Sequence, residues 1–244
     1  MTSNIFVEND KLQTRINELK PLSEQQITEL RRYFNIGLAY NSNALEGNTL
    51  TESETKAVIE DGLTVGGKPL KHHLEAIGHN KAFNHIFTLT KNAGITEEDI
   101  KKLHFLFYSG IDAENAGVYR KIRVFISGSE HKLPAPEKLP ELMKKFAEKY
   151  SNFKQNEHPI QTAAQIHKDF VFIHPFIDGN GRIARLLMNL VLINAGFPIT
   201  IIPPILRSEY MNSLEKAHKD DKTFIEFISK SVKQAQLEYL RLLE

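Results

Sequence analysis

Apolar residues recur at helical spacing along most of this chain. A period of three to four residues places them on one side of an α-helix, whereas strand residues alternate. Residues 183–195 carry a broad apolar face and are followed by Gly196 and Pro198, which predicts a buried helix that stops there. Two further stripes have the same spacing: Ile27, Leu30, Phe34, Leu38 and Leu45, and then Leu139, Leu142, Met143, Phe146 and Tyr150.

Helix-start signals support the same fold class. Capping boxes or caps are expected at three places: Ser23 with Gln26, Thr51 with Glu54, and Thr96 with Asp99. Alternation typical of a strand occurs clearly in one place, at Ile122, Val124 and Ile126, just before Ser127 and Gly128. We therefore expect a single all-α domain with one small β-hairpin.

Composition narrows the functional classes. The chain has 244 residues, and its 31 Lys and Arg against 30 Asp and Glu give a formal charge of +1, which indicates neither a nucleic-acid nor a membrane surface. It contains no cysteine, so a thiolate metal site, a cysteine nucleophile and a disulfide framework are excluded. Without a targeting segment in its first 20 residues, the chain is expected in the cytoplasm.

The most informative segment runs from His174 to Arg182 and reads HPFIDGNGR. It precedes the predicted buried helix, and a helix start exposes unpaired amides and the positive end of the helix dipole. The amides around Gly179, Asn180, Gly181 and Arg182 therefore predict an anion site, with glycines that let a phosphate approach closely and Asn180 as a helix cap.

Four side chains around this turn have the chemistry for a nucleotide. His174 has a pKa range suited to taking a proton from an attacking hydroxyl. Asp178 is placed to hold Mg²⁺ together with phosphate oxygens. Arg182 and Arg185 lie on one face of the first helical turn and can grip phosphates as forks.

The segment from His174 to Arg185 resembles the signature of Fic-domain proteins, His-Pro-Phe-x-Asp-Gly-Asn-Gly-Arg-x-x-Arg, at every specified position. The resemblance covers about residues 40–230. Residues 117–134 look like the β-hairpin flap of that family, and residues 42–47 (SNALEG) are similar to its inhibitory motif, which includes Ser42, Glu46 and Gly47. The expected division is an N-terminal helical extension over 1–50, a catalytic domain over 51–230 and a C-terminal helix end over 231–244.

The resemblance implies a protein adenylyltransferase: His174 activates a Ser, Thr or Tyr hydroxyl that attacks the α-phosphate of ATP. It implies that the amides of 179–182 stabilise the developing charge, that Asp178 holds Mg²⁺ and that Arg182 contacts the β- and γ-phosphates. Gly181 favours nucleotidyl transfer over phosphorylation, and Tyr210 is a candidate wall of the base pocket. The flap residues Phe125, Ile126, Ser127, Gly128 and Ser129 would dock the target.

The expected partners are ATP, a target protein with an accessible hydroxyl, the chain itself as a substrate of self-modification, and a second copy in a homo-oligomer. By the same resemblance, Glu46 would pair with Arg185 where the γ-phosphate should sit and so inhibit transfer.

Other interpretations stay open beside this one. The same site could remove AMP from a modified protein, with Glu46 orienting a water. A nucleotide-sensing module without chemistry would need the cradle but not His174. A zinc site at His72, Glu75 and His79 is a further hypothesis, although the spacing is not the HExxH pattern and solvated histidines are the commoner explanation.

Overall fold

The computed structural model describes residues 5–126, 128–153 and 157–243, and within these ranges it is all-helical. The α-helices and two short 3₁₀ helices follow one another as α1 (Val7–Glu18), α2 (Glu24–Ala44), α3 (Glu52–Glu60), α4 (Leu70–Leu89), α5 (Glu97–Tyr108), η1 (Pro136–Lys138), α6 (Leu139–Lys149), α7 (Pro159–Ile173), α8 (Asn180–Asn194), η2 (Pro204–Leu206), α9 (Arg207–Lys216) and α10 (Lys222–Leu243). The all-α prediction is confirmed.

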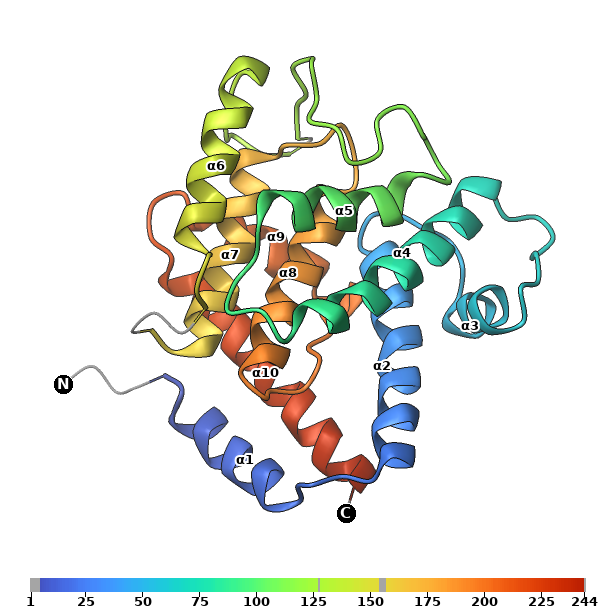
Figure 1. Cartoon of the computed structure of the whole chain (residues 1–244), viewed down its shortest axis with the longest axis vertical. Helices are drawn as coiled ribbons and strands as arrows, with labels where there is room; N and C mark the ends of the chain where they lie inside the picture. The colour runs from blue at the N-terminus through green and yellow to red at the C-terminus, as the bar shows by residue number, and fades with distance from the viewer. Residues whose placement is uncertain (1–4, 127, 154–156, 244) are drawn as a thin grey trace.

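Helix α8 forms the centre of the domain. It packs most closely against α7 and also contacts α4, α2 and α5, with α6 covering the far side of α7 (Figure 1). Almost every residue from Arg182 to Leu192 is buried, as expected for a helix surrounded by others. The predicted helix over 183–195 is thus confirmed, and it begins slightly earlier, at Asn180.

The three expected capping boxes are present. In each, the side chain of Ser23, Thr51 or Thr96 accepts the amide three residues on, and the side chain at that third position accepts the cap's own amide. These reciprocal bonds satisfy two amides that a helix start leaves without partners. They fix where α2, α3 and α5 begin.

The predicted hairpin is not confirmed, because the described residues between 117 and 134 take an irregular course without a strand assignment. A two-stranded ribbon is only marginally stable by itself, and the described part of the chain has no further strand that could support one here. The carbonyls of Ile122 and Pro134, at the two ends of the segment, instead accept from the Arg120 guanidinium at 2.9 and 2.7 Å. We call residues 122–134 the flap; Ser127 lies outside the described residues.

The two ends of the chain are tied together. Helix α1 packs along α10, and Asn9 donates to the Ser229 carbonyl at 3.0 Å and to Gln236 Oε1 at 3.1 Å. Helix α10 is continuous through the expected boundary at residues 230–231. None of the described helices has the length and apolar character needed to cross a lipid bilayer.

A single amide side chain joins α8 to the segment that follows it. Asn189 is fully buried; its Nδ2 donates to the carbonyls of Arg185 and Thr200 at 3.0 Å each, and its Oδ1 accepts the Thr200 amide at 2.7 Å. Because Thr200 is itself fully buried, its backbone groups depend on this side chain.

We therefore expect Asn189→Leu to destabilise the fold by at least about 2 kcal/mol, since a buried polar group left unpaired costs about 1–3 kcal/mol. Denaturant unfolding followed by circular dichroism measures this. The matched control is Asn212→Leu, on the exposed face of α9, which should change stability by less than about 0.5 kcal/mol. Equal stability of both variants would contradict the account.

Candidate active site

The loop between α7 and α8 begins at His174, which ends α7 in a left-handed conformation with a φ of 51°. Residues with a Cβ adopt this region at a cost, so neighbouring contacts have to hold it. Ring Nδ1 of His174 lies 3.3 Å from the Val171 carbonyl oxygen. Because a carbonyl only accepts, Nδ1 carries the proton, and Nε2 remains an acceptor.

The imidazole of His174 is neutral near pH 7. Burial lowers its pKa to about 4; the hydrogen bond to Val171 opposes this, the positive charge of Arg120 adds to it, and the charges of Glu46 and Asp178 oppose it. A neutral ring with a free Nε2 is the form that can take a proton from a hydroxyl.

Asn180 ties the loop to itself. Its Oδ1 accepts the Phe176 amide at 3.0 Å, and its Nδ2 donates to the Phe176 carbonyl at 2.8 Å. The predicted role of Asn180 as helix cap is wrong, because the cap position is Gly179 and Asn180 is already the first residue of α8. Its side chain points back across the loop instead of over the helix start.

His104, on α5, holds the loop through contacts with Phe176 and Asp178. Its ring stacks on Phe176 with centroids 3.7 Å apart, its Nε2 donates to the Asp178 carbonyl at 3.1 Å, and its Nδ1 accepts the Gly117 amide at 2.8 Å. Because Nε2 donates while Nδ1 accepts, this arrangement requires the neutral ring. Burial lowers the pKa of His104 to about 4, which favours that form near pH 7.

The start of α8 has the features of an anion site. Gly179 has a φ of 80°, and no side chain caps the helix. Gly181 lies directly under the Glu46 carboxylate: a Cβ built on Gly181 would collide with Glu46 Oε1. A carboxylate oxygen therefore lies against the helix start, where an anion is stabilised by the amides and the dipole.

Arg185 holds that carboxylate. Its guanidinium is fully buried, and it donates to Ser42 Oγ, to the Ser42 carbonyl and to Glu46 Oε1, at 2.9, 2.9 and 2.8 Å. Burial opposes the charge of Arg185, but Glu46 and Tyr210 together outweigh it and raise the pKa of Arg185. Burial likewise opposes the charge of Glu46, and Arg185 and Arg182 hold its pKa below the usual value.

Arg182 is engaged with two other carboxylates. It donates to Glu75 Oε1 at 2.9 Å and to Asp178 Oδ1 at 3.0 Å, and Lys71 Nζ lies 3.2 Å from Asp178 Oδ2. Burial opposes the charge of Asp178, but Arg182 leads the contacts that hold its pKa below the usual value. The second oxygen of Glu75 accepts from Asn48 Nδ2 at 2.8 Å, which links this cluster to the turn that carries Glu46.

The profile of the Fic/DOC family matches residues 94–192, which include α5, α7, the loop and most of α8. A protein adenylyltransferase Fic from Nematostella vectensis is 40% identical over 205 residues, covering 82% of this chain and 48% of that protein. One from Drosophila grimshawi is 40% identical over 194 residues, covering 78% of this chain and 40% of that protein.

Solved structures agree. Fic-1 of C. elegans superimposes with a TM-score of 0.85 at 29% identity, covering 96% of this chain and 72% of that one. A Fic domain containing signaling protein from Bacteroides thetaiotaomicron gives a TM-score of 0.87 at 28% identity, with coverage of 99% and 98%.

The chain belongs to the Fic/DOC family. It spans less than half the length of the two curated relatives described above.

In this Fic domain the structure brings most of the predicted site residues together. His174, Asp178 and the start of α8 lie in one loop and turn, and the predicted contact between Glu46 and Arg185 is present. Gly47 follows Glu46 with a φ of 93°, which turns the chain out of α2. Ser42, predicted as part of the regulatory motif, binds Arg185 directly.

Tyr210 is placed differently from the prediction of a base-pocket wall. It is fully buried, its hydroxyl lies 3.4 Å from Arg185 Nη1, and the same hydroxyl contacts His167 Nε2 at 2.8 Å. In this arrangement Tyr210 supports Arg185 from within the core and does not face an open pocket.

Of the predicted docking residues, Phe125 and Gly128 are exposed on the flap, Ser129 is bound to α9, and Ser127 lies outside the described residues. Phe125 is 92% exposed, and Gly128 has a φ of 80°. Ser129 donates to Glu215 Oε2 on α9 at 2.7 Å, and Glu215 also accepts the Glu130 amide at 2.9 Å. The base of the flap thus contacts α9, while its tip is free to meet another molecule.

The three residues of the zinc hypothesis have separate environments. Glu75 binds Arg182, His72 Nδ1 lies 3.2 Å from the Thr49 amide, and His79 is fully buried. No group of three or more metal-ligating side chains of the His, Cys, Asp and Glu types is found in the described ranges.

Sequence reasoning missed His104, Glu75 and the backbone contacts of Arg120 as parts of the site. The contacts that bring these residues to the His174 loop and to α8 join positions 54 to 107 residues apart, as Arg120 with His174 and Glu75 with Arg182 illustrate. A single sequence contains no signal for such pairs, because each residue looks like an ordinary helix or loop residue locally.

The buried histidines make the fold sensitive to acid. Burial lowers the pKa to about 3 for His79 and His167 and to about 4 for His104 and His174. The unfolded chain has a histidine pKa of about 6.5. A histidine whose pKa is lower in the folded protein makes its full contribution to stability above that pH, and the contribution is lost as the pH falls. Below pH 6.5 each histidine should reduce the unfolding free energy by about 1.4 kcal/mol per pH unit.

His79→Leu isolates one of these contributions, because neither ring nitrogen of His79 has a hydrogen-bond partner in the described part of the chain. We expect the variant to lose less stability than the parent between pH 6.5 and 4.5. Urea titrations at several pH values measure the slope. His85→Leu, on the same helix, is the control, and an unchanged slope in His79→Leu would contradict the assignment.

Proposed function

We propose that this Fic domain transfers AMP from ATP to a Ser, Thr or Tyr hydroxyl of a target protein. The observation that carries the proposal is the orientation of His174, whose Nδ1 donates to the Val171 carbonyl and leaves Nε2 as the proton acceptor, in the loop that leads into the start of α8. A proton acceptor next to an anion site is the arrangement that phosphoryl chemistry needs, because positioning and electrostatics supply most of the catalysis. The curated relatives, named protein adenylyltransferase Fic, support the same reaction.

In the proposed step, Nε2 of His174 takes the proton of the target hydroxyl while that oxygen forms a bond to the α-phosphorus of ATP. The bond from the α-phosphorus to the bridging oxygen breaks, and pyrophosphate leaves with that electron pair. The amides of Asn180, Gly181 and Arg182 would stabilise the charge that develops on the phosphate oxygens, and the Gly179 amide, which now donates to Asp178 Oδ1 at 2.6 Å, would join them if that contact opened. The Val171 carbonyl keeps the ring in the productive tautomer.

The fit to magnesium rests on Asp178. It is the one carboxylate of the loop, it lies next to the anion site, and hard carboxylate oxygens beside phosphate oxygens suit this ion. When bound, Mg²⁺ would neutralise phosphate charge. Asp178 Oδ2, now 3.2 Å from Lys71 Nζ, would be its protein ligand, so Lys71 would have to give up this contact.

Arg182 and Arg185 are the proposed phosphate contacts, and in this state both are occupied by the protein's own carboxylates. Glu46 lies against the start of α8 and pairs with Arg185, so it covers the position in which the γ-phosphate would be bound. We infer that ATP meets a site restrained by Glu46. Tyr210 would then hold Arg185 in place for the phosphate and would not contact the base.

The proposed partners are ATP, a target protein that meets the flap near the exposed Phe125, and the chain itself as a substrate of self-modification. Removal of AMP through the same site is a second activity that the position of Glu46 supports, since its charge acts on His174. In that reaction Glu46 would orient a water molecule.

Incubation of the protein with ATP labelled at the α-phosphate, compared with ATP labelled at the γ-phosphate, tests the reaction. Label should reach protein from the α position alone, and His174→Ala should abolish transfer while ATP binding stays largely intact. Transfer from the γ position would show phosphorylation, and normal transfer by His174→Ala would eliminate the proposed base.

Glu46→Gly should raise transfer from α-labelled ATP, self-modification included, by more than about tenfold, because a misplacement of about 1 Å can cost about a hundredfold in rate. Glu29→Gln, an exposed carboxylate on the same helix α2, is the control and should leave transfer unchanged. Unchanged or reduced transfer by a folded Glu46→Gly would contradict autoinhibition. A simultaneous loss of AMP removal from a modified target would favour the second activity.

A further inference from the structure

Arg120 is buried at the junction of the flap and the His174 loop. Its Nε donates to the His174 carbonyl at 2.8 Å, its Nη1 to the Ile122 carbonyl at 2.9 Å and its Nη2 to the Pro134 carbonyl at 2.7 Å. Its own amide donates to the Pro175 carbonyl at 2.9 Å. One side chain therefore contacts both ends of the flap and the residue that carries the proposed base.

Carbonyl oxygens accept all three of these guanidinium hydrogen bonds of Arg120, and the charge of Glu137 acts on it from further away. Only 3% of the residue is exposed, and none of the ion pairs found among the described residues includes it. Burial lowers the pKa of Arg120, which shows that the site disfavours the charge. A buried charge without a directly paired carboxylate is costly, and Glu137 offsets only part of that cost, so an arginine here is a poor choice for stability alone.

The geometry of the guanidinium explains why an arginine occupies this position. Its planar fork has donors in fixed directions, and here each of the three nitrogens meets a carbonyl from a different segment of the chain. A lysine ammonium has no such fixed directions. The His174 backbone, which is in a strained left-handed conformation, is held on one side by this contact.

We propose that Arg120 is a positioning residue that sets the flap in register with the His174 imidazole. The proposal rests on the function proposed above, in that the flap presents the target hydroxyl and His174 removes its proton. A shift of either segment relative to the other would move the hydroxyl away from Nε2. Arg120 fixes that distance because a single rigid group contacts both segments.

The electrostatics of His174 give an independent sign of this role. The charged groups that act on His174 are Arg120, Glu46 and Asp178; Arg120 lowers the pKa of the ring, and the two carboxylates raise it. Removing the charge of Arg120 should therefore raise the pKa of His174.

Arg120→Gln and Arg120→Lys, made in the Glu46→Gly protein, separate geometry from charge. Both should lower kcat for transfer by about a hundredfold, with KM for ATP within about twofold, because the acceptor and not the nucleotide is misplaced. The acidic limb of the pH profile should move to higher pH in Arg120→Gln and less in Arg120→Lys. Lys121→Gln, at the exposed neighbouring position, is the control and should change neither quantity.

An NMR titration of the His174 ring tests Arg120 without any enzyme activity, so it remains decisive if the proposed reaction proves wrong. The pKa of His174 should be higher in Arg120→Gln than in the parent and in Lys121→Gln. An unchanged pKa, or an equal loss of kcat and of folded protein with no pH shift, would overturn the positioning role. If Arg120→Gln does not fold, the kcat and KM of Arg120→Lys decide.

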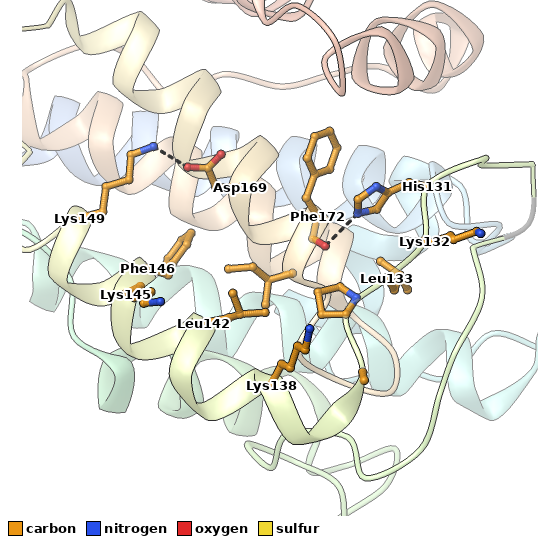
Figure 2. A pocket seen from close by; sticks show the side chains of 13 residues that line it. His131, Lys132, Leu133, Lys138, Leu142, Lys145, Phe146, Lys149, Asp169 and Phe172 are labelled. Atoms are coloured by element: carbon orange, nitrogen blue, oxygen red, sulfur yellow. Dashed lines mark hydrogen bonds and ion pairs between the residues drawn. The ribbon is translucent and has the colours of Figure 1, made fainter.

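A second feature is a groove beside the C-terminal end of the flap. The groove, of about 700 Å³, runs between flap residues 131–134, with Ala135 just beyond them, and helices α6 and α7. Figure 2 shows it from close by. Its apolar lining includes Leu142 and Phe146 of α6 and Phe172 and Ile173 of α7.

The groove is positively charged. Among the described residues, four lysines and one carboxylate, Asp169, line it. Asp169 accepts from Lys149 Nζ and from the Tyr150 hydroxyl at 2.7 Å each, and Lys145 Nζ donates to Glu141 Oε1, outside the lining, at 2.6 Å, which leaves a net positive charge. The lysines are Lys132, Lys138, Lys145 and Lys149. An apolar floor with a basic rim is complementary to a segment that carries apolar side chains between carboxylates.

The position of the groove connects it to the proposed reaction. Ile173 in its floor directly precedes His174, and Pro134 in its wall is an acceptor of Arg120. We infer that the groove binds an acidic, partly apolar segment of the target polypeptide, near the hydroxyl that His174 would activate. This inference also rests on the proposed function, but binding can be measured without catalysis.

The probe is a fluorescent peptide of glutamates around a central Leu-Phe pair, used with a peptide that has lysine in place of glutamate and one that has serine in place of Leu-Phe. Fluorescence anisotropy should show binding of the first peptide alone. Lys138→Glu with Lys145→Glu should weaken it by at least about tenfold. Lys144→Glu, exposed on α6 outside the lining, is the control and should have little effect.

Equal weakening by Lys144→Glu, or equal binding of the serine peptide, would overturn the inference, because either result means unspecific attraction of negative charge. Tighter binding of anionic phospholipid vesicles or of RNA than of the peptide, abolished by the same paired substitution, would assign the groove to another class of partner and would equally overturn it.

Discussion

The arrangement of the site depends on the contact between Arg185 and the end of α2. The fully buried guanidinium of Arg185, in the central helix, donates to the side-chain oxygen and the carbonyl of Ser42 and to the carboxylate of Glu46. Removing one partner of such a pair would leave an uncompensated buried charge. The position of α2 relative to α8 therefore depends on the same pair of charges, Glu46 and Arg185, that occupies the anion site.

The same principle extends to the first motif arginine. Arg182 binds Glu75 and Asp178, and Glu75 in turn holds Asn48, two residues beyond Glu46. In this state the protein's own carboxylates occupy the groups that we propose for the triphosphate. Nucleotide binding then becomes an exchange of anions at fixed cations. The free energy of that exchange, and not the presence of the cations, would determine activity.

Much of the fold was predictable, because it rests on local signals. The capping boxes at Ser23, Thr51 and Thr96 and the apolar pattern of 183–195 depend on residues three or four apart, and the structure contains them. The contact between Glu46 and Arg185 was predictable only through the resemblance to a family, since 139 residues separate the two.

The failures have physical reasons as well. Alternating residues at 122–126 indicated a strand, but Arg120 takes two of the carbonyls at the ends of the flap. Asn180 looked like a helix cap, yet its amide side chain makes two bonds to Phe176 in the preceding loop. Tyr210 looked like a pocket residue, and burial against Arg185 and His167 places it in the core. Each outcome depended on a tertiary partner that no local pattern contains.

We infer that the Glu46 carboxylate takes the place of the γ-phosphate at Arg185. Paired crystal structures of the parent protein and of Glu46→Gly, each with a non-hydrolysable ATP analogue and Mg²⁺, test it most directly. The account predicts that γ-phosphate oxygens lie within hydrogen-bond distance of the Arg185 guanidinium in Glu46→Gly and not in the parent. The same triphosphate position in both structures, whether on Arg185 or away from it, would contradict the claim.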